Sequence, residues 1–125
     1  MNKTLALRTV VVEALTTVMP EGSKVYYQTA QKNHPDIYAV YLLDQLTNID
    51  GQIGYELEIN VIGYGPDTST VEDLADAVQA LFNKKVVITD DIGVHFYAER
   101  RNTVEEEDRN ILRRRLTFSA YVYER

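Results

Sequence analysis

The segment from Gly54 to Gly63 alternates between apolar and polar residues. The apolar residues fall on one side of an extended chain: Tyr55, Leu57, Ile59 and Val61. The polar residues fall on the other side: Glu56, Glu58 and Asn60. This period of two predicts a strand with one buried face and one face in water. An apolar segment precedes it and an amphipathic segment follows, so we expect the strand near the middle of a sheet, with a helix on its apolar face.

Length and composition favour a single domain over residues 1–125. The chain has no cysteine, which excludes disulfides, thiolate metal sites and cysteine nucleophiles. No apolar run approaches the ~20 residues of a membrane helix, and the first residues lack the apolar core of a signal peptide. We therefore expect a cytoplasmic protein. The net charge of -6 argues against sequence recognition of nucleic acid, which needs a basic face.

The charge is spread unevenly along the chain. Residues 36–91 carry eleven acidic and two basic side chains, whereas residues 1–35 and 92–125 each have a small basic excess. Copies of such a chain attract one another head to tail if the two kinds of region lie on opposite sides. The alternative is that solvated faces differ in charge by chance.

Two segments have helical periodicity. Residues 3–19 place Leu7, Val11, Leu15 and Val18 on one face, and Pro20 ends the pattern. Residues 69–82 carry a second apolar stripe, and Ser69 and Glu72 have the spacing of a capping box, with Ser69 as the N-cap.

The remaining apolar segments predict strands. They cover residues 25–28, 37–46, 54–63, 86–88, 93–101 and 112–124. The run 37–46 lacks alternation, which favours a strand covered on both faces. Residues 47–53 are expected to form a projecting loop that contains the Asp50-Gly51 turn signal, and residues 102–110 are expected to form a charged, solvated loop.

The pattern therefore predicts an α+β fold: a mostly antiparallel sheet with two helices packed on one face.

Catalytic, cofactor and metal sites are not indicated by the sequence. His34 stands beside a proline in a loop, and His95 lies on the polar side of a strand, with no nucleophile paired to either. Asp90 and Asp91 are typical of a turn, since a metal needs further ligands. The glycines at 63 and 65 precede a helix but lack the spacing of a phosphate-binding loop, and Asp67 would repel phosphate.

The last strand has a polar side with residue types common at protein interfaces. Its side chains are Arg113, Arg115, Thr117, Ser119, Tyr121 and Tyr123. We interpret four of these, Arg113, Arg115, Tyr121 and Tyr123, with Glu56 and Glu58, as a candidate assembly interface. The alternative is an exposed face that is stabilised by cross-strand pairs, for example with Glu56, Glu58, Tyr97 or Glu99, and the two interpretations are compatible.

The order of these segments resembles the tail terminator, or tail completion, proteins of long-tailed bacteriophages, which are sometimes called minor capsid proteins. The features that carry the resemblance extend over nearly the whole chain: helix 5–19 ended by Pro20, the entry Pro35–Tyr41 to an apolar strand, strand 55–62, helix 69–82 and the terminal strand that starts at Arg113. These are patterns rather than signature motifs, and no catalytic residue is carried over.

The resemblance implies a structural virion protein without enzymatic activity or cofactor. Such a protein caps the tail tube as a ring, typically of six copies, ends tail growth and offers the surface to which the head joins. Its partners would be copies of itself, the tail tube protein and a head completion or connector protein. It would assemble in the host cytoplasm and end in the virion, at the head-proximal end of the tail. Loop residues that could contact these partners are Asn48, Asp50, Glu105, Glu106 and Arg109.

Three other functions are compatible with the sequence. The chain could be another head–tail connector or tail-tube component, a small host enzyme, or a host-encoded adaptor.

Overall fold

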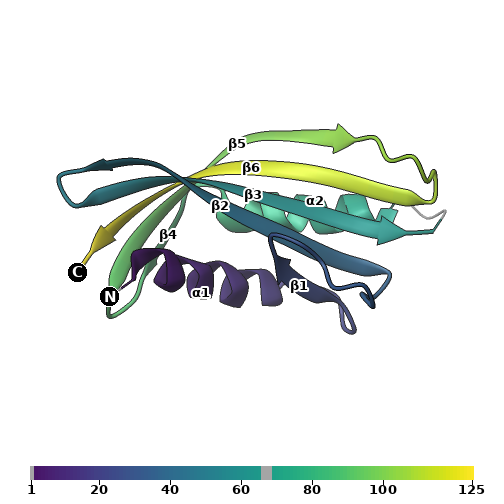
Figure 1. The fold of residues 1–125 in the computed structure, drawn as a ribbon, viewed down its shortest axis with the longest axis horizontal. Helices are drawn as coiled ribbons and strands as arrows, with labels where there is room; N and C mark the ends of the chain where they lie inside the picture. Colours follow the sequence, from purple (N-terminus) through teal and green to yellow (C-terminus); the bar gives the residue numbers. More distant parts are fainter. Residues whose placement is uncertain (1, 66–68) are drawn as a thin grey trace.

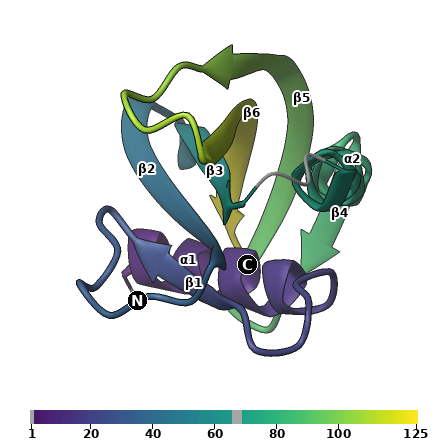
Figure 2. The same cartoon turned by 90° about the vertical axis from the view of Figure 1, so that its right-hand side faces the viewer.

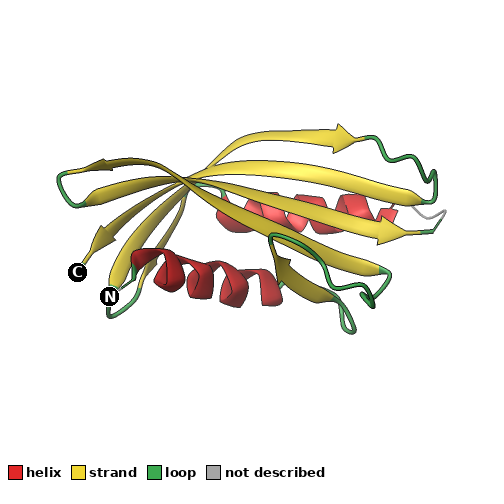
Figure 3. Ribbon diagram, in the orientation of Figure 1, coloured by secondary structure: helices red, strands yellow, loops and turns green. Residues whose placement is uncertain are grey.

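The computed structural model describes residues 2–65 and 69–125. Its elements, in chain order, are α1 (Lys3–Thr16), β1 (Lys24–Tyr27), β2 (Ile37–Ile49), β3 (Gln52–Tyr64), α2 (Ser69–Phe82), β4 (Lys85–Ile88), β5 (Ile92–Val104) and β6 (Ile111–Glu124). Figure 1 shows the long strands β2, β3, β5 and β6 twisting past one another with both helices beside them, and Figure 3 shows how little of the chain is loop. The predicted α+β class is confirmed.

The strands form one mixed sheet in the order β1-β2-β3-β6-β5-β4. Every neighbouring pair is antiparallel except β1 and β2, which are parallel. The strand predicted to lie mid-sheet, now β3, is indeed flanked by β2 and β6. Figure 2, which looks along the sheet, shows β2 and β5 curling to either side of these central strands.

The core lies between the helices and one face of this sheet. The predicted apolar residues of β3 are at most 2% exposed, and the apolar residues of β6, from Leu116 to Val122, are equally buried. Leu7, Val11 and Leu15 of α1 and Val71, Val78 and Phe82 of α2 complete the same cluster. Phe82 contacts the rings of Phe96 and Phe118 at centroid distances of 5.0 and 5.5 Å. Burial of these side chains is the largest favourable term in folding, at ~25 cal/mol per Å² of apolar surface.

The segment 47–53, which the sequence predicts as a loop, is mostly strand. β2 continues to Ile49 and β3 begins at Gln52, so the loop contains only Asp50 and Gly51. Both have positive φ, 52° and 80°, as the type I′ hairpin turn requires. The turn signal was therefore correct and the loop prediction was wrong. Pairing between β2 and β3 continues through residues 47–49 and 52–54, although their side chains are mostly polar. The hairpin still projects beyond the other strands, as Figure 1 shows.

The connector predicted at 102–110 is also shorter than expected. β5 continues to Val104 and β6 begins at Ile111. A bulge between Ala98 and Arg100 shifts the register of β5 against β6. As a result Arg101, rather than Arg100, lies opposite Leu116 on the helix-covered face.

Two residues predicted to face water are buried. Asn60 of β3 is 1% exposed and Thr117 of β6 is 2% exposed. Both lie in the middle of the face opposite the helices, where neighbouring side chains from adjacent strands cover them. Val40 of β2 is buried on the same face, which agrees with the prediction that this strand is covered on both sides.

The helix ends differ slightly from the prediction. α1 ends at Thr16 rather than at residue 19, because the next residues form a turn before Pro20. α2 has the predicted bounds, but Ser69 is its first helical residue rather than its N-cap, and the preceding position lies outside the described residues. Asp67, which entered the argument against phosphate binding, also lies outside them.

Gly63 tests how tightly α2 packs against β3. A Cβ at this position would overlap Cγ2 of Val71, in the first turn of α2. We expect Gly63→Ala to lower the free energy of unfolding by about 1–3 kcal/mol through overpacking, and Val71→Ala to recover part of this loss in the double variant. Urea denaturation measures both. Gly54→Ala is the comparison, since its Cβ would overlap Oγ1 of Thr47, an exposed residue of β2, rather than a side chain of the core.

Candidate interaction surface

The face of the sheet opposite the helices, here called the open face, carries the candidate interface residues. Glu56 and Glu58 lie on β3, opposite Ser119 and Thr117 of β6. The other four, Arg113, Arg115, Tyr121 and Tyr123, follow one another along β6 at a spacing that keeps them on this side. The structure therefore brings all six residues to one face, as the sequence predicts.

The charges of the open face are paired within the chain. Arg115 Nε lies 3.5 Å from Glu58 Oε1, and Arg100 of β5 lies 3.5 Å from Glu56. Glu58 also accepts a hydrogen bond of 2.9 Å from the amide of Asn60. Such partly exposed ion pairs stabilise a protein only weakly, at ~0–1 kcal/mol each. The open face is consequently a neutralised, polar surface with both signs of charge interleaved.

Arg113 holds the buried Asn60 and the loop 105–110 together. Its Nε donates to Asn60 Oδ1 at 2.9 Å, and its Nη1 lies 3.2 Å from a carboxylate oxygen of Glu106. Nearby, burial raises the pKa of Tyr38, an effect opposed by Arg113 and reinforced by Glu106. Glu106 is thus half-buried against the sheet, although the sequence suggested a solvated position.

The two tyrosines of β6 contact aromatic rings of β5. Tyr121 meets Tyr97 edge to face, with centroids 6.1 Å apart, and Tyr123 lies 6.0 Å from the ring of His95. Tyr97 and Tyr121 are both exposed. Together these rings make an aromatic end to the open face, next to the exposed Val86 and Ile88 of β4.

The candidate loop residues divide between the two ends of the molecule. Asn48 and Asp50 are exposed at the tip of the β2–β3 hairpin, beside Leu46 and Ile49, which are 64% and 66% exposed. Glu105, Glu106 and Arg109 belong to the β5–β6 loop at the opposite end, as Figure 1 shows. The two sets of candidate loop residues therefore lie at opposite ends of the sheet.

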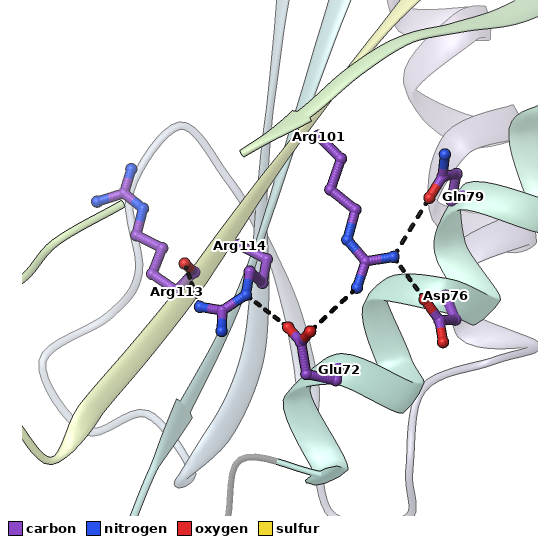
Figure 4. A network of polar contacts seen from close by, with 6 residues as sticks. All are labelled: Glu72, Asp76, Gln79, Arg101, Arg113 and Arg114. Atoms are coloured by element: carbon purple, nitrogen blue, oxygen red, sulfur yellow. Dashed lines mark hydrogen bonds and ion pairs between the residues drawn. The ribbon is translucent and has the colours of Figure 1, made fainter. Parts of the chain in front are cut away.

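A charged cluster on the helix-covered side was missed from the sequence. The carboxylate of Glu72, in the first turn of α2, contacts the guanidinium groups of Arg101 and Arg114. Arg101 also contacts Asp76, and its Nη1 donates a hydrogen bond of 3.2 Å to Gln79 Oε1. Figure 4 shows how the two arginines reach α2 from neighbouring strands. The available signal was Arg114, whose even spacing from Leu116 places a charge on the apolar side of its strand.

The remaining candidates for chemistry do not converge. His34 stacks on Tyr38 with a centroid distance of 4.1 Å, and its Nδ1 lies 2.9 Å from the Pro35 carbonyl oxygen. Asp90 and Asp91 are exposed in a turn that Thr89 organises through its hydroxyl. In residues 2–65 and 69–125, no group of three or more His, Asp or Glu side chains is placed to hold a metal ion.

A groove of about 490 Å³ opens on the open face beside the β1–β2 loop. It is lined by polar side chains from both, among them His34, Asn60 and Arg113.

Neither described helix is long and apolar enough to span a membrane.

Several solved structures share this fold. A chain of the virion of a native gene transfer agent particle is 16% identical, with a TM-score of 0.60 over 87% of this chain and 84% of that chain. A second structure, of a protein without a descriptive name, is 13% identical, with a TM-score of 0.66 over 98% of this chain and 92% of that chain. At these identities the likeness shows the fold. No protein-family model and no curated protein sequence matches the chain.

The Glu72 cluster is expected to link α2 to the sheet. Replacement of Glu72 by Gln removes a carboxylate shared by two largely buried arginines, and should lower the free energy of unfolding by about 1 kcal/mol. Asp76→Asn is the matched control, because Asp76 is more exposed and contacts Arg101 alone. Urea denaturation at low and high salt measures the difference; equal losses in the two variants would contradict a linking role for Glu72.

Proposed function

We propose that this chain is a structural protein of a phage-like virion. The observation that carries the proposal is the fold, which matches a chain of a gene transfer agent virion over most of the length of both. The surface supports it: the open face presents interleaved charges and exposed tyrosines, a composition suited to protein contacts. Within the described residues, catalytic groups do not converge anywhere on this surface.

More specifically, we propose that the protein caps the tail tube as a ring, ends tail growth and forms the surface that joins the head. Its partners would be copies of itself, with six copies in the ring, together with the tail tube protein and a head completion or connector protein. Assembly would take place in the host cytoplasm, with the finished ring at the head-proximal end of the tail. The resemblance in the order of elements supports this role, and the projecting hairpin and β5–β6 loop supply contacts at opposite ends of each copy.

The alternative within the same class is another head–tail connector or a tube component. The virion neighbour is compatible with each of these, since its description names the particle and no part of it. Particles assembled without this protein separate the alternatives. Overlong or headless tails in electron micrographs would support the cap, and tailless heads would support a connector.

A direct test uses purified protein and the tail tube protein encoded by the same genome. We expect the protein to bind one end of assembled tubes and to shorten the length distribution when it is added during tube growth. Electron microscopy measures both quantities. Tubes of unchanged length and bare ends would refute the capping role.

The open face can be tested with charge reversal. We expect Arg115→Glu to reduce ring formation or tube binding several-fold while circular dichroism stays native, because Arg115 is half-exposed and faces Glu58. Arg113→Glu does not separate assembly from stability, since it also leaves the buried Asn60 without its hydrogen-bond donor. Lys85→Glu, at an exposed position of β4, is the control for net charge. Unchanged assembly in the Arg115 variant would show that this part of the open face is free in the virion.

A further inference from the structure

Among the described residues, two long stretches of strand have no neighbour on their outer side. β1 pairs with β2 only over residues 38–41, and β4 pairs with β5 only over residues 93–96. In the described parts of the chain, residues 42–49 of β2 and 97–104 of β5 therefore lack a ladder partner on their outer edges. Unpaired edges of this length are available for pairing with another chain.

The backbone of both edges is oriented for such pairing. The carbonyl of Tyr41 accepts from the amide of Gln28, outside the β2–β3 ladder, at 2.9 Å. Backbone groups alternate in direction along a strand, so the residues of β2 whose side chains lie on the helix-covered side direct their backbone groups to the outer edge. The next such residue after Tyr41 is Leu43. At the other edge, the carbonyl of Ile92 accepts from Thr89 at 2.8 Å. By the same argument, and past the bulge, Arg101 and Thr103 direct their backbone groups outward.

We propose that the free edge of β5 in one copy pairs with the free edge of β2 in a second copy of this chain. β2, β3, β6 and β5 alternate in direction, so β2 and β5 run in opposite directions. A second copy in the same orientation therefore brings its β2 antiparallel to β5. The two patches differ, so the contact is head to tail, and it forms a ring when the rotation closes. This inference rests on the proposed ring and names the strands that join its copies.

The positions of the two edges suit a closed barrel. Through the registers, residues 42–49 of β2 lie level with residues 117–123 of β6, and residues 97–104 of β5 lie level with residues 113–119. The centres are offset by about four residues, or ~13 Å, across a repeat of four strands that is ~19 Å wide. This stagger corresponds to a strand tilt of ~35°, which lies in the range that barrel closure requires.

One register joins the edges without a gap. With Asp44 of one copy opposite Asn102 of the next, Leu43 meets Thr103 and both point their backbone groups at each other. Asp44 then lies diagonal to Arg100, which is 65% exposed and also pairs with Glu56, so opposite charges meet across the joint. In this register the tip of the second copy's β2–β3 hairpin ends where β4 of the first copy begins, and β1 of the second copy begins beyond Val104 of the first. Each short edge strand thus covers a part of the edge that the joint leaves open.

Cysteine cross-linking tests this register, since the chain contains no cysteine of its own. We expect Asp44→Cys with Asn102→Cys to form, on oxidation, a ladder of disulfide-linked oligomers on a non-reducing gel. Across the joint these positions form a non-hydrogen-bonded pair with Cα atoms ~4.5 Å apart, within disulfide range. Within one copy β3 and β6 separate them by ~14 Å across the sheet, and they are also offset by about four residues along the strands. Asp44→Cys with Ser119→Cys is the control, because Ser119 lies on a central strand.

Proline tests the edge independently. Thr103→Pro removes an amide that points away from β6. We therefore expect a native circular dichroism spectrum, with at least a tenfold loss of cross-linked product in the Asp44→Cys, Asn102→Cys background. Thr103→Val, which keeps the amide, should cross-link normally.

The outcomes separate this inference from the proposed function. Rings in electron micrographs that do not cross-link above the control would overturn the edge pairing and leave the ring role intact. Cross-linked open chains without rings or tube binding would support the pairing and overturn the capping role. A Thr103→Pro variant that cross-links as well as Thr103→Val would also overturn the pairing.

Discussion

Burial of the apolar face of the long strands beneath α1 and α2 is the interaction on which the other features depend. The strands β3 and β6 supply most of that face, and Phe82 of α2 packs between Phe96 and Phe118 at its centre. With one side of the sheet covered, the other side is left to carry charges and tyrosines. The open face is therefore a consequence of where the helices pack.

The open face is well ordered by contacts within the chain. Arg113 and Arg115 each have a carboxylate partner, and Arg113 also satisfies the buried Asn60. A partner that docks here exchanges existing weak ion pairs for new ones, so affinity would come from the exposed rings, Tyr97 and Tyr121. The free edges of β2 and β5 differ from the open face, because they offer backbone groups whose pairing does not require breaking a contact in the described structure.

A good part of the fold could be predicted from the sequence. The apolar stripes of both helices, the alternation of β3 and the Asp50-Gly51 turn each reflect a local rule, and each is confirmed, except that Val18 lies beyond the end of α1. The errors lie where strands are long and polar, at 47–53 and 102–104, because pairing with a neighbouring strand there supplies what the residues themselves do not. The shift of Arg101 to the helix side depends on a bulge that no local pattern indicates.

For the candidate surface, the sequence by itself determined that Glu56, Glu58 and the polar residues of the last strand share one face, because side chains alternate along a strand whatever lies beside it. Only the tertiary structure decided which of them meet, that Asn60 and Thr117 are buried among them, and that β1 and β4 cover just part of each edge. These features follow from strand order and register. Both are set by contacts between segments far apart in the chain, which local periodicity does not encode.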